Sequence, residues 1–201
     1  IGLVEVGSDQ RTRDYNEIGD VIPQMKALTA VNPNSALIPV NRISGVTTSL
    51  VLPAGGVYSG TAALINLHGY TPDQMYAGFE AVVLNYPVSG RRGWWDRRSE
   101  DEIKKAAEKA IEEMKNVWEQ AKQYARIDSA LRAEGNVNKA DYYPEMEALL
   151  PYVKSEKPVI LNVSAAKDIL SAIKWVEEND VNAIFSGVEE GWRVAEELAE
   201  E

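Results

Sequence analysis

Few side chains in this sequence could act as a nucleophile, a general base or a metal ligand. Among its 201 residues there is one histidine, His68, and there is no cysteine. Disulfides and thiolate chemistry are therefore excluded. A serine hydrolase would need His68 as its base, but the Gly-x-Ser-x-Gly turn that presents such a serine does not occur. His68 precedes Gly69, and in such a turn a hydrogen-bonded histidine is more common than a catalytic base.

The stretch SGVTTSLVLPAGG, Ser44–Gly56, combines an apolar strand with a glycine-rich loop, the kind of loop that often borders a ligand. Residues 55–60 have the Gly-x-x-x-x-Gly spacing of a phosphate-binding P-loop, but that motif continues with Lys and then Ser or Thr. Here Thr61 and an alanine follow, and no Gly-x-Gly-x-x-Gly fingerprint is present. The nucleotide-binding interpretations therefore fail, and Gly55 and Gly56 remain candidates for the wall of a substrate pocket.

The chain is acidic, with 21 Lys and Arg against 31 Asp and Glu, a net charge of −10 and a pI near 4.8. This charge argues against binding to a phosphate backbone. The basic cluster Arg91, Arg92, Arg97 and Arg98 surrounds two tryptophans and leaves open a stacking site for nucleic acid. A solvated loop whose tryptophans pack inward is the favoured alternative. We therefore expect no nucleic-acid partner.

The length of 201 residues suits one domain. No run of apolar residues reaches the roughly 18 that a membrane helix needs. We therefore expect a soluble protein without a membrane partner, and any N-terminal targeting region to lie outside this sequence. The cellular compartment stays open.

Five apolar, β-branched stretches predict the strands that must hold the candidate residues. They are Val46–Leu52, Ala62–Leu67, Ala81–Tyr86, Pro158–Val163 and Asn182–Phe185. Strands of this composition are typically covered on both faces, as in a parallel sheet. The last two alternate with helical patterns, which predicts crossover connections and either a barrel or an open doubly wound sheet. We expect all five strands to run parallel in one curved sheet.

Residues 99–135 predict one long, acidic, amphipathic helix. Ser99 and Glu102 form a capping box, and apolar residues then recur every three or four positions until Gly135. Its acidic face is usually explained by solvation, and a contact with another protein is the alternative. Farther along the chain, Ser164 is expected to cap the helix that starts at Ala165.

Three phrases of the sequence, in order, resemble the amidohydrolase superfamily, and most closely its imidazolonepropionase-like and prolidase-like metal-dependent hydrolases. They are DYNEIGDVIPQMKALTAVNPNS, GVTTSLVLPAGG and SGTAALINLHG. The tail is similar too, since PVILNVSAAKDILSAIKWVEEND and VNAIFSGVEEGWRVAEEL resemble two of the family's strand-and-helix segments. The resemblance covers nearly the whole chain and thins across residues 93–138.

The resemblance implies an α/β fold, a partial (β/α)8 TIM barrel of the amidohydrolase type. Residues 1–201 would form a single partial catalytic-barrel domain with roughly strands 2 to 6 and their helices. In such enzymes one or two divalent metals activate a water that attacks a carbon–nitrogen bond, here a non-peptide bond of a small-molecule substrate. The metal expected in the whole protein, if it is active, is zinc.

Mapped by its motifs, this chain lacks the family's metal ligands. The resemblance places a His-x-His pair before Ile1, histidines at the ends of the fifth and sixth strands, and an aspartate on an eighth strand beyond Glu201. Asn162 stands at the fifth-strand position and Ser186 at the sixth. The resemblance therefore implies that this chain binds no cofactor or metal and is inactive on its own.

Six residues are our candidates for the substrate pocket: Asn162, Ser186, Gly55, Gly56, Asn85 and His68. For Asn162 and Ser186, a structural role in hydrogen bonding the backbone at strand ends is the alternative. A non-catalytic small-molecule-binding or scaffold domain derived from the same barrel is the alternative for the whole chain. An opened barrel would expose strand edges, so the expected partner is the remainder of the protein or a second copy in a dimer.

Overall fold

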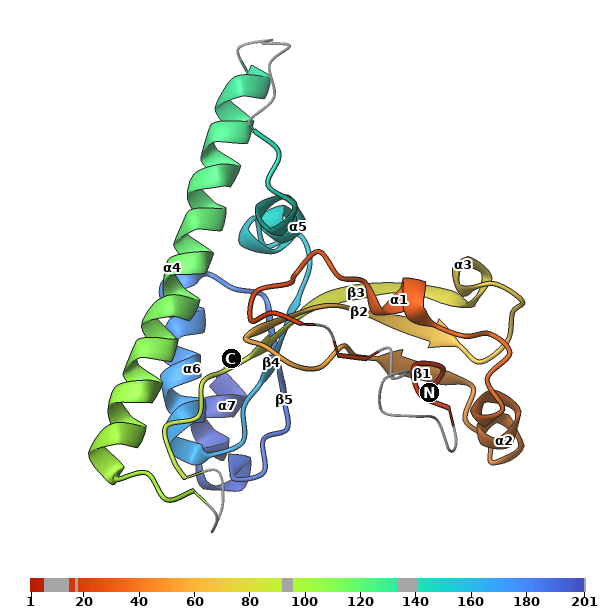
Figure 1. Cartoon of the computed structure of the whole chain (residues 1–201), viewed down its shortest axis with the longest axis horizontal. Helices are drawn as coiled ribbons and strands as arrows, with labels where there is room; N and C mark the ends of the chain where they lie inside the picture. The colour runs from red at the N-terminus through yellow and green to blue at the C-terminus, as the bar shows by residue number, and fades with distance from the viewer. Residues whose placement is uncertain (6–14, 17, 92–95, 134–140, 201) are drawn as a thin grey trace. The chain divides into compact units, whose positions relative to one another are not determined.

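The computed structural model describes residues 1–5, 15–16, 18–91, 96–133 and 141–200. Two compact units divide the chain, Ile1–Val83 and Leu84–Glu201. Five strands follow one another in the sheet in the order β1-β2-β3-β4-β5 (Figure 1). The chain therefore has an α/β fold whose five-stranded sheet is consistent with part of a barrel.

The described part of the first unit contains three short helices and the first strands. Its elements are α1 (Ala27–Ala30), α2 (Leu37–Ile43), β1 (Thr48–Val51), β2 (Tyr58–Asn66), α3 (Pro72–Met75) and most of β3 (Tyr76–Asn85). Along β2 nearly every residue is buried, including the apolar run that predicted a strand from Ala62 onward. Ile65, Leu67 and Met75 are completely buried in the core of this unit.

The expectation that all strands run parallel is wrong for β1 and β2. These two strands are antiparallel, with Thr48 opposite Asn66 and Val51 opposite Ala63. The reason is the length of the connection. Only residues 52–57 lie between β1 and β2, whereas a parallel pair needs a crossover of a dozen residues or more.

The second unit contains the long helix and the alternating strands and helices of the tail. Its elements after the end of β3 are α4 (Glu100–Ala133), α5 (Pro144–Val153), β4 (Val159–Asn162), α6 (Ala166–Asn179), β5 (Ala183–Ser186), the 3-10 turn η2 (Gly191–Arg193) and α7 (Ala195–Glu200). Here the parallel prediction is confirmed, since β4 and β5 are parallel with α6 as their crossover. Their register places Asn162 beside Ser186.

Helix α4 begins as its capping box predicts. The backbone N–H of Ser99 donates to Glu102 Oε2 at 2.8 Å, and the N–H of Glu102 donates to Ser99 Oγ at 3.3 Å. The predicted apolar stripe of the helix is buried, including Met114 and Trp118. The ring of Trp118 packs edge to face against that of Trp175 in α6, with 5.3 Å between the ring centroids. The described part of α4 ends at Ala133, so the predicted stop at Gly135 lies outside the described residues.

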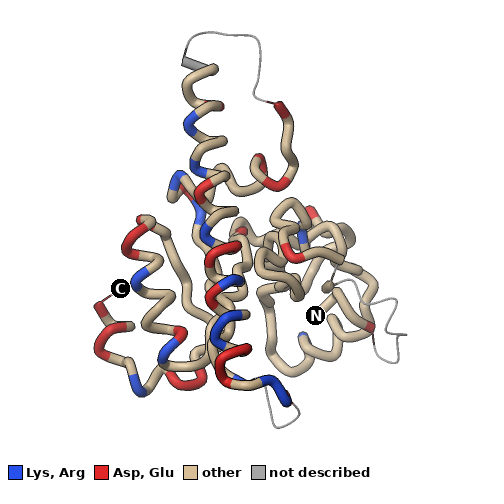
Figure 2. The backbone as a smooth tube through the Cα atoms, turned by 60° about the vertical axis from the view of Figure 1, so that its left-hand side comes forward, with Lys and Arg blue, Asp and Glu red and all other residues tan. Residues whose placement is uncertain are grey.

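Acidic and basic residues are interspersed along α4 (Figure 2), and most of them are exposed. Pairs one turn apart, such as Lys104 with Glu108 at 3.9 Å, are exposed and stabilise the helix only weakly. None of the described helices combines the length and the apolarity that crossing a membrane requires.

The basic cluster before α4 is partly engaged within its own loop. Arg98 forms an ion pair with the buried Asp96 at 2.7 Å, and Arg91 donates to the backbone oxygen of Asp96 at 2.7 Å. These bonds use the guanidinium groups that a nucleic-acid site would need. Arg92 and the two tryptophans lie outside the described residues.

Candidate site at the carboxyl ends of the strands

The carboxyl ends of β3, β4 and β5 carry three of the six candidate residues, Asn85, Asn162 and Ser186. The Nδ2 atom of Asn162 donates to Oδ1 of Asn85 at 3.1 Å. Ser186 is the register partner of Asn162 on the next strand. We call these three residues the strand-end cluster. Asn162 is exposed and the other two are half-buried, so the cluster is accessible to a ligand.

Backbone hydrogen bonds fix the same strand ends. The N–H of Tyr86 donates to the carbonyl oxygen of Asn162 at 3.0 Å, and the N–H of Val163 donates to the carbonyl oxygen of Ser186 at 3.0 Å. Both bonds belong to the residues that follow β3 and β4 directly. The side chains of the strand-end cluster are therefore presented from a rigid edge rather than from a loop.

Gly187 lets the chain turn closely around Asn162. Its φ of +71° lies in the left-handed region that favours glycine. A Cβ atom at this position would stand 2.5 Å from Oδ1 of Asn162. Gly187 was not among the predicted candidates, although a glycine at an apolar strand often marks close backbone approach.

Glu190, in the loop after β5, caps helix α6. Its Oε2 accepts from the N–H of Ala166 at 2.8 Å, its own N–H donates to the oxygen of Ser164 at 3.0 Å, and its Oε1 accepts from Arg193 at 3.1 Å. The hydrogen bond from Ala166, followed by the charge of Arg193, holds the pKa of Glu190 below its usual value. The predicted cap by Ser164 is wrong, because Ala165 is the N-cap residue and makes no side-chain cap bond. Instead, the carboxylate of Glu190 caps the helix and so joins the loops after β4 and β5.

The loop after β3 is fastened to α6 by two further contacts. The buried carboxylate of Asp168 accepts from the N–H of Ser89 at 3.1 and 3.3 Å. The hydroxyl groups of Tyr86 and Ser171 lie 2.7 Å apart. Burial, opposed by this hydrogen bond, raises the pKa of Tyr86. Asp168 and Tyr86 thus position the loop, and neither needs a catalytic role to explain its burial.

The other three candidates, Gly55, Gly56 and His68, lie in the first unit. His68 is exposed, one residue beyond the buried Leu67 that follows β2. In the loop between β1 and β2, φ is +90° at Gly55 and +64° at Gly56. A Cβ on Gly55 would collide with the side chain of Asn16, and one on Gly56 would stand 2.6 Å from the oxygen of Gly19.

The glycines therefore allow residues 15–16 and 18–26 to lie along the loop and the start of β2. The N–H of Ala54 donates to the oxygen of Tyr15 at 2.6 Å, and the N–H of Val57 donates to the oxygen of Asp20 at 2.8 Å. Single parallel bridges continue this pairing at Val21 with Tyr58 and at Lys26 with Thr61. Close backbone packing accounts for the glycine-rich loop without a ligand.

The donor chemistry of the strand-end cluster does not fit a zinc ion. Tight zinc sites take imidazole, thiolate and carboxylate ligands, whereas Asn85, Asn162 and Ser186 offer neutral amide and hydroxyl groups. The amides of the two asparagines are also bonded to each other. Across the part of the chain that the structure describes, no group of three His, Cys, Asp or Glu side chains stands close enough to hold a metal.

Comparisons with known proteins relate this geometry to one fold. No model of a known protein family matches the chain, and no curated protein sequence matches it. Among solved structures, the chain is similar to the crystal structure of an amidohydrolase from Thermotoga maritima, with a TM-score of 0.85 and 20% sequence identity. The match covers 100% of this chain and 52% of the other, so the chain spans about half the length of that protein. The fold of this chain is amidohydrolase-like.

Proposed function

We propose that this chain is part of a hydrolase of the amidohydrolase type that acts on carbon–nitrogen bonds other than peptide bonds in a small molecule. The observation that carries the proposal is the fold match along the entire chain. The strand-end cluster adds support, because parallel strands of α/β enzymes commonly place substrate-contacting residues at their carboxyl ends.

In this proposal the chain supplies a wall of the active site and the zinc ligands come from other parts of the protein. Asn162 and Ser186 would orient the substrate through hydrogen bonds, since an amide and a hydroxyl each offer both a donor and an acceptor. Neither group can activate a water by itself, because neither has an ordinary pKa near neutrality. The chain alone is therefore expected to be inactive.

Turnover by the natural protein that contains this chain tests the proposal. The protein is offered amides, imides and cyclic ureides, each with and without added zinc, and the released amine or acid is measured. We expect turnover of at least one class. Asn162→Ala should then lower kcat/KM by about 2- to 10-fold, the effect of one lost hydrogen bond.

Asn182→Ala is the matched control for this substitution. Asn182 is also an exposed asparagine next to β5, but it precedes the strand and lies at the opposite end from the cluster. Its replacement should leave kcat/KM unchanged. Absence of turnover for every substrate class, with or without zinc, would contradict the proposed activity.

A non-catalytic domain that binds a small molecule, or serves as a scaffold, is the second candidate function. The amide–amide hydrogen bond between Asn85 and Asn162 favours it, because this bond lies where the family resemblance places a metal ligand. The same substrate panel separates the two functions. A ligand that raises the melting temperature of the natural protein without being turned over would support the binding function and exclude hydrolysis of that ligand.

The terminal strands of the sheet suggest a partner. Strands β1 and β5 stand at the two ends of the strand order, and unpaired strand edges favour pairing with another chain. We propose that another part of the protein, or a second copy of this chain, pairs with them. Light scattering of the natural protein and of the isolated chain distinguishes these partners, and a monodisperse monomer of the isolated chain at high concentration would contradict the pairing.

A further inference from the structure

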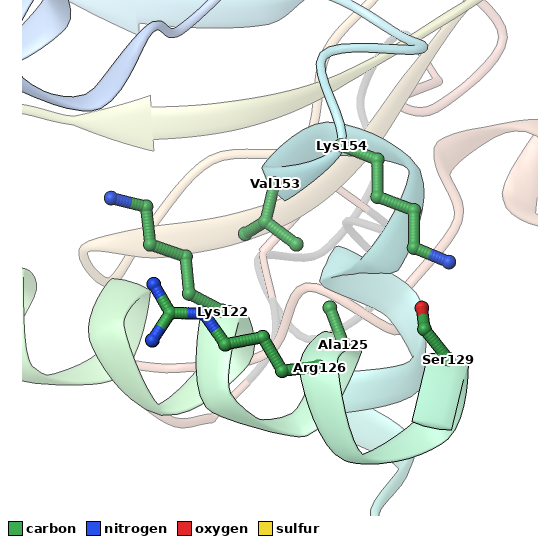
Figure 3. A pocket seen from close by; sticks show the side chains of 6 residues that line it. All are labelled: Lys122, Ala125, Arg126, Ser129, Val153 and Lys154. Carbon is green, nitrogen blue, oxygen red and sulfur yellow. The ribbon is translucent and has the colours of Figure 1, made fainter. Parts of the chain in front are cut away.

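A hollow of about 470 Å³ between α4 and α5 is cationic, although the chain as a whole carries a net charge of −10. Six residues line it: Lys122, Ala125, Arg126, Ser129, Val153 and Lys154 (Figure 3). Three of them are basic and none is acidic. A hollow of this kind concentrates anions at its surface. Its volume lies within the roughly 300–1,000 Å³ of small-molecule sites.

The floor of the hollow is apolar. Ala125 belongs to a packed cluster with Tyr124 and Leu150, and Val153 packs against the same cluster. Figure 3 shows the side chain of Val153 directed toward α4, with Ala125 opposite it. Packing against these two side chains would bury the methylene groups of a ligand.

Polar groups stand on either side of this apolar floor. Figure 3 shows Arg126 extending to one side of Val153, and Lys154 to the other side together with the hydroxyl of Ser129. Lys122 extends to the same side as Arg126, but its ammonium already donates to Asn179 Oδ1 at 2.7 Å and to Glu119 Oε1 at 3.2 Å.

Arg126 and Lys154 differ from Lys122 in this respect. Among the described residues, no ion pair joins either of them to a carboxylate. Arg126 also borders a second hollow of about 430 Å³, whose lining includes Glu119. Because Glu119 offsets the charge of Arg126 there, the second hollow is the poorer site for an anion.

We propose that the hollow between α4 and α5 binds a small, elongated dianion with an apolar middle, such as an aliphatic dicarboxylate. One carboxylate meets the guanidinium of Arg126, which matches its planar geometry. The other accepts from the ammonium of Lys154 and the hydroxyl of Ser129. The methylene chain lies on Ala125 and Val153. This site is separate from the strand-end cluster and goes beyond the proposed hydrolase function.

Three probes of equal chain length test the ligand class on the ¹⁵N-labelled natural protein by NMR titration at low ionic strength. Suberate carries two carboxylates, octanoate carries one and 1,8-octanediol carries none. We expect suberate to shift the amide resonances of α4 and α5 and to bind about tenfold more tightly than octanoate, since one charge-assisted contact is lost. The diol should bind more weakly still. Equal affinity for the three probes would overturn the proposal. So would the absence of shifts at about 10 mM suberate, because binding weaker than this is too weak to assign to a site.

Charge-removing variants test the named residues. Lys154→Gln and Arg126→Gln should each weaken suberate binding about tenfold. Lys174→Gln is the matched control, because Lys174 is an exposed lysine of α6 that pairs with Glu178 at 3.8 Å and does not line the hollow. Equal weakening by the control would show nonspecific attraction and overturn the site. If Arg126→Gln loses its helical circular dichroism, Lys154→Gln and Ser129→Ala decide the outcome.

Discussion

At the level of single residues, Gly187 and Glu190, both in the loop after β5, shape the surroundings of the strand-end cluster. Gly187 has a left-handed backbone and leaves room for the amide of Asn162. Glu190 connects the segments after β4 and β5 through two hydrogen bonds, from the N–H of Ala166 and to the oxygen of Ser164, and it also accepts from Arg193 of its own segment. Both residues act on the position of the cluster, so their substitution should change stability before it changes any chemistry.

Gly187→Ala should lower the free energy of unfolding by about 1–3 kcal/mol, because alanine would be strained at φ +71° and its Cβ would press against Asn162. Urea denaturation of the natural protein measures the loss. Gly90→Ala is the control, because the space around Gly90 is open and its φ is not in the left-handed region. A loss for Gly187→Ala no larger than the loss for the control would contradict the close packing.

Glu190 should make stability depend on pH. Its pKa is lowered in the folded state, so its contribution is fully present above the unfolded value of about 4.3 and is lost as the pH falls through the folded value. Glu190→Gln should remove this contribution to stability. Melting temperatures measured from about pH 3 to about pH 6, a range that brackets the unfolded pKa of glutamate, test this. The control is Glu189→Gln, because Glu189 is the exposed neighbour of Glu190, and this substitution should leave the pH dependence of melting unchanged. Identical pH profiles for wild type and Glu190→Gln would show that the carboxylate does not hold the loops.

At the scale of elements, the edge-to-face contact of Trp118 and Trp175 joins α4 to α6. Trp118 is 1% exposed, and truncating a buried tryptophan costs about 3–5 kcal/mol. Trp118→Ala should therefore unfold the second unit at a much lower urea concentration. The control is Trp192→Ala, because Trp192 is 78% exposed and its loss should change stability by about 0.5 kcal/mol or less. Similar effects of both substitutions would contradict the packing of α4 on α6.

The regular alternation of strand and helix after residue 158 made β4, α6 and β5 predictable, because a buried strand followed by an amphipathic helix has few other solutions. The direction of β1 was mispredicted from composition, since an apolar strand fits a parallel or an antiparallel sheet equally well. The short connection of residues 52–57 between β1 and β2 is what indicates an antiparallel pair. Asn162 and Ser186 were singled out because the family resemblance places metal ligands at their positions. They end β4 and β5, as Asn85 ends β3, and their role in a substrate pocket stays a prediction. The cap by Glu190 was missed because its partner Ala166 lies 24 residues away, and no local pattern predicts such a contact.

At the scale of the whole molecule, the chain has an amidohydrolase-like fold and spans about half of a related structure. The strand ends in its second unit carry neutral side chains that bond to one another. We propose that these strand ends take no part in holding a metal, whatever other regions of the protein contribute. We propose that their polar groups orient a ligand.

Metal content of the natural protein after dialysis tests this claim most directly. The double variant Asn162→Ala, Ser186→Ala is compared with wild type and with Asn182→Ala, which alters the opposite end of β5. We expect the same number of zinc ions per chain in all three proteins, because amide and hydroxyl groups are weak zinc ligands. Loss of a tightly bound zinc ion in the double variant alone would contradict the claim.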